Sequence, residues 1–481
     1  MRGVAPLTSG KYDAVVVGSG PNGLSAAITI ARAGRSVLVL EAESTWGGGT
    51  RTAELTLPGF HHDICSSAHP LLAGSPFFRG LALGDLGIEM VQPELPLAQP
   101  LEDGSAVVME RSIEATADGL GADAGAYRRL MRRSVGAADQ LIPELLAPAH
   151  LPRHPLLMAR FGIPALLSAS ALSRAGFKGE RARALFAGLA AHSMQSLTAP
   201  ATAAFGMVMG ILGHAYGWPL VRGGSHVIAD GLVAELRRLG GEVETGRRVA
   251  SLAEVPDSRA VLFDLTPRQV VDIAGDQLSE RYQRSLSRYR YGPGVFKLDL
   301  ALDGPIPWRA EECRRAGTIH IGSSLQEIVN SETLVSRGSV ADTPYTIVIQ
   351  PTLCDPGRAP AGKHIAWLYC HVPAGYSVDL TEILLARVEH FAPGFRDLIL
   401  QVSTMDPAAI EAHNPNYIGG DINGGIQDLR QLFTRPTVSI TPYATSNPRL
   451  YICSSSTPPG GGVHGMCGVF AAGVALRRAL A

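Results

Sequence analysis

The chain has 481 residues, 46% of them apolar and 18% charged, so it can bury a large core in two or more domain-sized units. Its 42 Lys and Arg nearly balance its 43 Asp and Glu, and no basic stripe predicts a nucleic-acid partner. The N-terminus lacks the pattern of a secretory signal, and no run of 18 apolar residues predicts a transmembrane segment, so we expect a cytoplasmic protein.

The six cysteines are far apart in the sequence, and no two of them have the C-x-x-C spacing of a redox pair or a zinc site. They are Cys65, Cys313, Cys354, Cys370, Cys453 and Cys467. We therefore expect reduced, mostly buried thiols, and neither dithiol chemistry nor a metal site.

The N-terminal segment predicts a strand, a glycine-rich turn, a helix and a second strand. Residues 13–17 are a valine-rich run typical of a parallel strand buried on both faces, a helical pattern covers residues 24–33, and residues 36–40 repeat the strand pattern. The turn after the first strand fits G-x-G-x-x-G, the fingerprint of a dinucleotide-binding fold. It consists of Gly18, Ser19, Gly20, Pro21, Asn22 and Gly23.

Each part of this turn has a physical role at a dinucleotide. Gly18 permits the tight turn, Gly20 lets a pyrophosphate approach the backbone, and Gly23 lets the helix pack closely on the strand. The helix N-terminus offers unpaired N–H groups to the phosphates, and Pro21 and Asn22 are assigned to the same site.

The second strand ends on Glu41, whose carboxylate can accept hydrogen bonds from an adenosine ribose, and Ala42 beside it is assigned to the same site. A second glycine cluster follows, where an NAD domain would normally continue into another crossover helix. This cluster resembles the G-G-x-x-R-T element of large FAD-dependent oxidoreductases, which favours FAD, and it predicts that Arg51 lies near the diphosphate or the isoalloxazine. The residues assigned to the cofactor here are Gly48, Gly49, Thr50 and Arg51.

Three histidines and an acid follow this cluster. His61, His62, Asp63 and His69 could suggest a metal, but their spacing is not that of a helical histidine pair, and FAD already explains the segment. We expect no metal, and we take His69 as a candidate catalytic residue near the flavin ring.

Residues 76–216 have a mostly helical pattern. Within them, residues 156–167 are strongly apolar. This stretch is either an ordinary buried helix, which we favour, or an apolar lid or surface patch for membrane contact.

Sequence blocks spread over nearly the whole chain resemble one family. They include VVVGSGPNGLSAA, WPLVRGGSHVIADGLVAELRRLGGEVETGRRV, NPNYIGGDINGGIQDLRQLFTRP and SSSTPPGGGVHGMCGVFAAG. The chain resembles the phytoene desaturase and carotenoid isomerase-like flavoproteins, most of all the branch named pyridine nucleotide-disulfide oxidoreductase domain-containing protein 2, within the wider flavin amine oxidase superfamily. The resemblance implies non-covalent FAD and redox or isomerisation chemistry on an apolar or conjugated substrate.

The resemblance also implies how the chain is divided. A helix at residues 227–239, a strand at 242–249 and another strand at 261–264 return the chain to the cofactor domain, with Val249 near the adenine. We predict an α/β fold with a discontinuous Rossmann-type FAD-binding domain and an α+β substrate domain of mixed sheet and helices. The first comprises residues 1–75, 217–285 and 421–481, and the second comprises 76–216 and 286–420.

Residues 294–300 predict an alternating strand that carries Lys297. Val295, Lys297 and Asp299 share one face of this strand. The segment resembles the strand of flavin amine oxidases whose lysine is linked through water to flavin N5, which implies a cation that promotes reaction of reduced flavin with oxygen. The alternative is a surface lysine on a half-exposed strand.

The C-terminal segment joins a predicted strand at 451–453 to a predicted helix at 469–480 through a glycine-rich stretch. The glycines let the backbone approach FAD, and the cofactor residues assigned here are Gly461, Gly462, Val463 and Met466. Gly465 stands where amine oxidases usually place an aromatic cage residue, so a simple amine substrate is disfavoured and Gly465 is a candidate determinant of substrate preference. His464, the nearest ring, either faces the flavin or substrate or is structural.

These observations predict an FAD-dependent dehydrogenase or oxidase. A hydride passes from a carbon of an apolar or ring-containing small molecule to flavin N5, and oxygen or another acceptor reoxidises the flavin. The alternatives are a flavin-dependent isomerase or saturase of a conjugated substrate, and an FAD-containing binding protein without turnover. Peripheral membrane contact and a homodimer are both left open.

Overall fold

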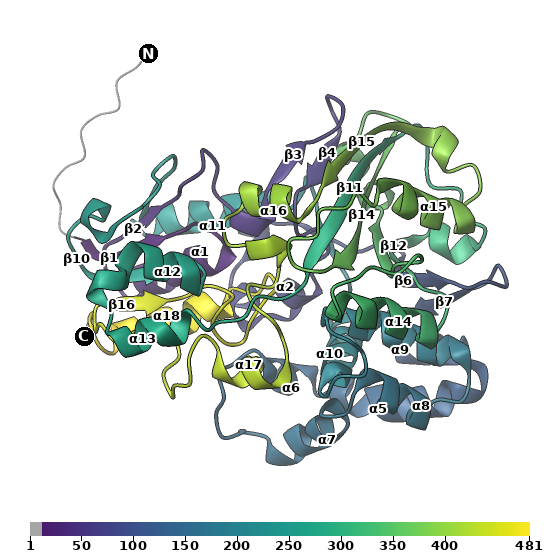
Figure 1. The fold of residues 1–481 in the computed structure, drawn as a ribbon, viewed down its shortest axis with the longest axis horizontal. Coiled ribbons are helices and arrows are strands. Elements are labelled where there is room, and N and C mark those ends of the chain that lie inside the picture. The colour runs from purple at the N-terminus through teal and green to yellow at the C-terminus, as the bar shows by residue number, and fades with distance from the viewer. Residues whose placement is uncertain (1–11) are drawn as a thin grey trace.

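The computed structural model describes residues 12–481. A five-stranded parallel sheet with the strand order β16-β10-β1-β2-β9 takes strands from three distant parts of the chain, which come together at the left of Figure 1. These strands are β1 (Tyr12–Val17), β2 (Val37–Leu40), β9 (Glu242–Glu244), β10 (Ser258–Phe263) and β16 (Leu450–Ile452). The predicted Rossmann-type, discontinuous α/β fold is confirmed.

Helix α1 (Pro21–Arg32) packs between α11 (His226–Arg238) and α18 (Met466–Leu476) on this sheet. Two glycines make the contact with α18 close. A Cβ on Gly468 would lie 1.9 Å from the Asn22 carbonyl oxygen, and a Cβ on Gly465, just before α18, would lie 3.1 Å from the Ser25 Cβ. Part of the C-terminal glycine crowding therefore serves helix packing.

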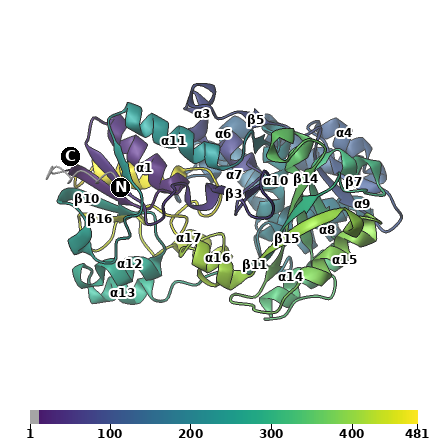
Figure 2. The ribbon, with the colours of Figure 1, turned by 90° about the horizontal axis from the view of Figure 1, so that it is seen from above.

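The second sheet has seven strands in the order β15-β11-β14-β13-β12-β6-β7, at the right in Figure 2. All its neighbouring pairs are antiparallel except β6 with β12. Its strands are β6 (Leu95–Pro100), β7 (Ala106–Met109), β11 (Gly294–Leu302), β12 (Ala316–Ile321), β13 (Thr346–Ile349), β14 (His364–Val372) and β15 (Ile399–Met405). The mostly helical pattern of residues 76–216 did not reveal β6 and β7.

Both faces of this sheet are covered. On one face, Phe296, Leu298 and Leu300 of β11 share a core with α15 (Thr381–Phe391), whereas Lys297 and its alternate neighbours point to the other face. Every residue of β11 is buried, so the alternative of a half-exposed strand is wrong.

Helices from residues 76–216 form a layer at the lower right of Figure 1. They include α5 (Ala124–Gly136), α7 (Pro155–Ala165), α8 (Ala169–Gly176), α9 (Glu180–Ala191) and α10 (Thr202–Ala215). No single helix within residues 12–481 is long and apolar enough to cross a membrane; α7 and α8 meet those criteria only as a pair, bent by 94°. All six cysteines are free, and four of them are buried.

The remaining strands are β3 (Thr52–Glu54), β4 (His61–Asp63), β5 (Met90–Val91) and β8 (Leu220–Val221). The remaining α-helices are α2 (Pro70–Gly74), α3 (Pro76–Arg79), α4 (Ile113–Asp118), α6 (Ala138–Leu145), α12 (Pro267–Ala274), α13 (Glu280–Leu286), α14 (Leu325–Ser336), α16 (Pro407–His413) and α17 (Leu429–Thr434).

Predicted and observed elements differ mainly at their ends. Helix α1 begins at Pro21, three residues before the predicted start, because proline suits the first turn of a helix. The strand predicted at 242–249 covers only Glu242–Glu244, and the C-terminal helix spans Met466–Leu476 where 469–480 was predicted.

The close contact of α1 with α18 predicts a position-specific stability loss. Gly468→Ala should lower the free energy of unfolding by about 1–3 kcal/mol, because the new methyl group meets backbone that cannot move aside. Gly473→Ala in the same helix is the matched control and should be neutral or stabilising, since its Cβ meets only the end of the Arg477 side chain. Chemical denaturation of both variants checks this; equal losses would contradict it.

Candidate active site

One continuous cavity of ≈ 360 Å³ extends from the parallel sheet to the second sheet. One half, the dinucleotide half, is lined by the carboxyl ends of β1, β2 and β10 and by the N-terminus of α1. The other half, the chamber, is lined by strands of the second sheet and by residues of α10.

Two glycine turns form the floor of the dinucleotide half. Gly18 has φ +100°, and a Cβ on Gly48 would lie 3.0 Å from the Gly20 Cα, so neither turn has room for a side chain between them. A Cβ on Gly23 would lie 2.1 Å from the Gly18 carbonyl oxygen, which places Gly23 in the helix–strand contact predicted for it. The Oδ1 of Asn22 is buried and has no hydrogen-bond partner among residues 12–481. Together with the two turns, it fits a dinucleotide held by backbone groups at a helix N-terminus.

Glu41 and Arg51 lie together at the end of β2. Arg51 Nη2 is 3.2 Å from Glu41 Oε1 and donates to the Thr45 carbonyl at 2.7 Å. The other carboxylate oxygen of Glu41 accepts from the backbone N–H and hydroxyl of Ser19 at 3.0 and 2.5 Å. Arg51 therefore lies beside the carboxylate that the sequence assigns to the ribose.

Asp264, which follows β10, lies at the N-terminus of α1 and was not predicted. Its Oδ2 accepts from the Gly23 N–H at 3.0 Å, and a Cβ on Gly20 would lie 2.6 Å from the same oxygen. Burial, reinforced by Glu41, raises the pKa of Asp264 to about 7, although backbone N–H groups of Gly23 and Gly20 favour its charged form. Below pH 7 this carboxyl is therefore mostly uncharged, which removes a negative charge from the helix end.

The C-terminal glycine stretch contributes a third wall. Gly461, Gly462 and Val463 line the cavity, and a Cβ on Gly461 would lie 2.9 Å from the Asn423 carbonyl oxygen. Gly465 does not line the cavity: it caps α18 with φ +68°, and its carbonyl accepts from the Ser25 hydroxyl at 2.6 Å. The assignment of Gly465 to the amine-cage position is therefore corrected, because this residue faces α1.

His464 is buried and held by backbone groups on both sides of its ring. Its Nε2 is 3.1 Å from the Gly460 carbonyl oxygen, and its Nδ1 accepts from the Met466 N–H at 3.1 Å. Burial lowers the pKa of His464 to about 4, so the ring is neutral. Neither His464 nor Met466 lines the cavity, and both hold the loop before α18 in shape.

His69 lines the cavity where its two halves meet. Its Nε2 is 3.0 Å from the Ser225 hydroxyl, and its Nδ1 is buried without a partner in residues 12–481. Burial lowers the pKa of His69 to about 4, so the ring is neutral near pH 7. Its position is compatible with the ligand contact predicted for it.

Lys297 borders a smaller cavity that shares Cys65, Trp367 and Tyr417 with the main one. Its Nζ donates to the Asp63 carbonyl at 3.1 Å and pairs with Asp299. Burial raises the pKa of Asp299 to about 6, although Lys297 favours its charged form.

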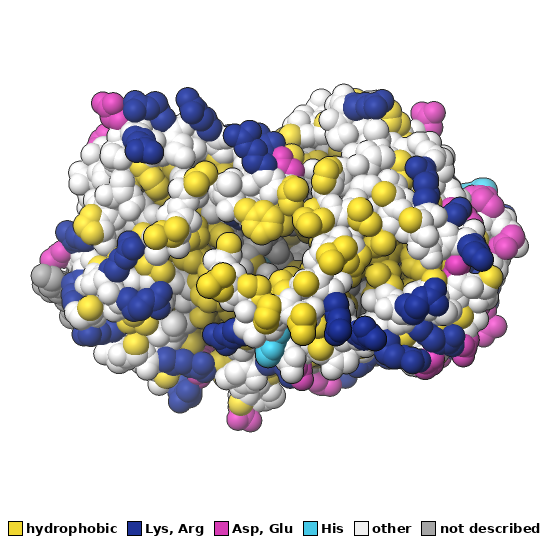
Figure 3. All heavy atoms as spheres, turned by 90° about the horizontal axis from the view of Figure 1, so that it is seen from below, with side chains coloured by type: hydrophobic (Ala, Val, Ile, Leu, Met, Phe, Trp, Pro, Cys, Tyr) yellow, Lys and Arg dark blue, Asp and Glu magenta, His cyan; other side chains and the backbone are white. Residues whose placement is uncertain are grey.

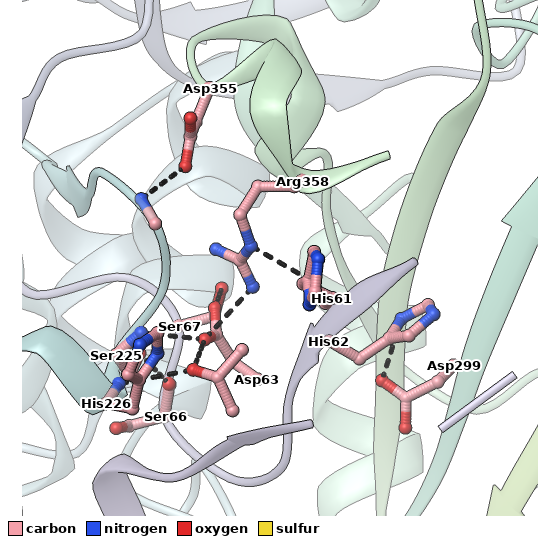
Figure 4. Close-up of polar contacts among 12 residues, drawn as sticks. His61, His62, Asp63, Ser66, Ser67, Ser225, His226, Asp299, Asp355 and Arg358 are labelled. Atoms are coloured by element: carbon pink, nitrogen blue, oxygen red, sulfur yellow. Dashed lines mark hydrogen bonds and ion pairs between the residues drawn. The ribbon is translucent and has the colours of Figure 1, made fainter. Parts of the chain in front are cut away.

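Asp63 is the centre of a buried polar cluster (Figure 4). Its carboxylate lies 3.1 Å from Arg358 Nη2 and accepts from the Ser225 N–H and the Ser67 hydroxyl. Burial opposes its ionisation, but Arg358 and these hydrogen bonds outweigh burial and lower the pKa of Asp63 to about 2. The Asp63 carboxylate and carbonyl thus contact three other chain segments, at Ser225, Arg358 and Lys297. Within residues 12–481, no group of three or more His, Cys, Asp or Glu side chains is arranged to hold a metal.

The chamber is mostly apolar and aromatic, and sequence reasoning had not identified it. Its wall includes the side chains of Leu71, Met194, Phe205, Met209, Trp218, Ile347, Ile349, Trp367 and Tyr369. Trp367 and Tyr369 are alternate residues of β14, with ring centroids 4.9 Å apart. The strand pattern at 365–369 was visible in the sequence, but the face these rings occupy depends on long-range strand pairing.

Most predicted cofactor residues line the cavity; Gly23 and Met466 are the two that do not. Those that line it are Gly18, Gly20, Pro21, Asn22, Glu41, Ala42, Gly48, Gly49, Thr50, Arg51, Val249, Gly461, Gly462 and Val463. Sequence reasoning missed Asp264 and the segment 414–417, which also line it.

Comparison with known proteins agrees with this architecture. The family model of the NAD(P)-binding Rossmann-like domain matches residues 16–79. The chain is 26% identical over 564 residues to mouse pyridine nucleotide-disulfide oxidoreductase domain-containing protein 2, covering 97% of this chain and 94% of the mouse protein. It is 26% identical over 412 residues to a phytoene desaturase of Fusarium fujikuroi, covering 77% and 68% of the two chains.

A structure of putrescine oxidase bound to putrescine superposes with a TM-score of 0.62 and 17% identity, covering 97% of this chain and 98% of the oxidase. The chain therefore has the amine oxidase fold. It is homologous to the mouse protein and to the phytoene desaturase, which confirms the resemblance predicted from its motifs.

The buried Asp264 predicts a pH-dependent stability. Because its folded pKa of about 7 exceeds the ordinary value of 3.8, the protonated carboxyl stabilises the fold at low pH, and this contribution is lost as the pH rises through 7. Asp264→Asn removes this dependence, so its stability relative to the natural chain should rise between pH 5 and 8, by at most about 1.4 kcal/mol per pH unit. Urea unfolding of cofactor-free protein measures the difference; one that does not change with pH would contradict this.

Proposed function

We propose that this protein is an FAD-dependent oxidoreductase that takes a hydride from a carbon of an apolar or ring-containing small molecule. The observation that carries the proposal is the single cavity, which joins a glycine-lined dinucleotide half to an apolar, aromatic chamber. Bound non-covalently, FAD supplies the redox chemistry as a hydride acceptor. The protein binds and orients the substrate and keeps water away.

The residues that would hold FAD follow from the cavity wall. Gly18, Gly20 and the N-terminus of α1 suit the diphosphate, and Glu41 suits the adenosine ribose. Val249 lies in the same wall, where an adenine fits beside β2. The glycines Gly461 and Gly462 leave space for the flavin end of the cofactor, near His69 and the chamber.

Lys297 is proposed to promote reoxidation of the flavin by oxygen or another acceptor. Its ammonium group is buried behind Cys65 and Trp367, 5.5 Å from the Trp367 ring centroid. A buried positive charge near the reacting centre stabilises negative charge that develops on an acceptor. His69 is proposed to contact the substrate or the flavin ring as a neutral hydrogen-bonding group.

The surface supports access for apolar compounds. Figure 3 shows apolar side chains gathered around a hollow on the lower face, with Lys and Arg at its edges. In α7, Leu156 and Ile163 are 74% and 73% exposed, so a buried helix is the wrong description of these side chains, although Phe161 is buried. We propose that this apolar face makes peripheral contact with membranes, from which such substrates are taken up.

A flavin-dependent isomerase or saturase is the second candidate. The aromatic chamber and the homology to a phytoene desaturase both fit a conjugated substrate. Product mass separates the candidates, because isomerisation leaves the mass unchanged whereas hydride removal lowers it.

Anaerobic titration tests the main proposal. Apolar, ring-containing compounds that bind the FAD-loaded protein should include substrates that bleach the flavin absorbance without oxygen, with recovery when air is admitted. Product formation without any flavin reduction during turnover would contradict the oxidoreductase proposal.

Lys297→Met should slow reoxidation of the reduced flavin by oxygen by 10-fold or more, since it removes the buried cation. Because this change leaves Asp299 as an unpaired buried carboxylate, the double variant Lys297→Met, Asp299→Asn is measured as well. Stopped-flow mixing of reduced protein with oxygenated buffer gives the rate constant. An unchanged rate constant in both variants would remove this role from Lys297.

A further inference from the structure

The chamber wall carries polar groups without protein partners. Thr318 on β12 is 1% exposed, lines the cavity, and its hydroxyl has no hydrogen-bond partner in residues 12–481. In the strand register, Thr318 lies opposite Ile349 of β13, and Ile349 lies opposite Trp367 of β14. The indole N–H of Trp367 also has no hydrogen-bond partner in residues 12–481. Buried polar groups in an otherwise apolar wall are costly to leave unpaired, so they point to a polar group on the ligand.

His192, just after α9, belongs to the same part of the wall. Its Nε2 lies 3.2 Å from Nε2 of His320, which is two residues from Thr318 on β12 and therefore on the same face. Burial lowers the pKa of His192 to about 3 and keeps that of His320 well below its usual value, so both rings are neutral. One of the two facing nitrogens must therefore donate and the other accept.

His192 lines the cavity. Its remaining ring nitrogen, Nδ1, presents a lone pair when Nε2 donates to His320 and an N–H when Nε2 accepts from it. The chamber thus offers this ring nitrogen and the hydroxyl of Thr318. Among the described residues, 12–481, the carboxylates that line the cavity are Glu41, Glu43 and Asp264, all in the dinucleotide half. This part of the chain therefore places no carboxylate in the chamber wall as a counter-ion for an ammonium group.

We propose that the substrate is a neutral alcohol: an apolar, ring-containing skeleton that carries a hydroxyl group bound by Thr318 and His192. This rests on the proposed function and narrows its substrate class. A hydroxyl donates and accepts at the same time, so it pairs with Thr318 and with His192 Nδ1 in either tautomer of the ring. A hydrocarbon leaves both groups unpaired, and a carbonyl pairs with His192 Nδ1 only when that nitrogen carries a proton.

A matched pair of fluorescent probes tests this in the FAD-loaded protein. The ratio of the naphthalene dissociation constant to that of 2-naphthol should fall about tenfold in Thr318→Val and in His192→Phe. Comparing this ratio between proteins cancels the different hydrophobicity of the probes. Thr318→Ser keeps the hydroxyl and should restore the ratio.

Thr346→Val is the control on the opposite face of the same sheet, where the Thr346 hydroxyl donates to the Pro344 carbonyl, and it should leave the ratio unchanged. A ratio unaltered in both Thr318→Val and His192→Phe would overturn the alcohol proposal. If these proteins still hold FAD and bind naphthalene, the proposed oxidoreductase function stands. If FAD-loaded natural protein binds neither probe, the chamber is not an apolar site and both proposals fail.

Discussion

The buried carboxylate of Asp63 is the interaction on which the rest of the site depends. It joins β4 to the start of α11 through Ser225 and to the segment after β13 through Arg358, while its backbone carbonyl holds Lys297 of the second sheet. The residues that follow it, 65–71, line the cavity where its two halves meet. The buried negative charge of Asp63 is tolerated because each chain segment that it contacts supplies a hydrogen-bond donor or a positive charge. Because all these groups must stay in contact with Asp63, they hold the two sheets in a fixed relative position.

The cavity separates charge from apolar surface along its length. Its carboxylates and arginines lie in the dinucleotide half, beside the helix N-terminus, whereas the chamber contributes rings, branched side chains and neutral imidazoles. A cavity with one charged half and one apolar half suits two ligands bound side by side, one highly polar and the other apolar. Glycines stand where backbone must approach a ligand or a neighbouring helix, and Gly18 and Gly468 illustrate these two reasons for the same residue type.

Local pattern was sufficient to predict the strand–turn–helix at the N-terminus, the position of Glu41 at a strand end and the glycine wall near the C-terminus. It was insufficient wherever side-chain direction depends on partners far along the chain. Trp367 faces the cavity because β14 pairs with β11 and β13, and Gly465 faces α1 because two helices more than 400 residues apart pack together. His464 resembled a catalytic ring in sequence, yet backbone groups occupy both of its nitrogens. Asp264 gave no signal of its own, since an acid after a strand is common.

We propose above that the dinucleotide half holds FAD without a covalent bond. The most direct measurement is the absorbance spectrum of the purified protein, followed by denaturation and identification of the released compound by mass. We expect a flavin spectrum and the release of one FAD for each protein chain. A protein that neither carries nor takes up FAD, or that binds a nicotinamide dinucleotide in its place, would contradict it.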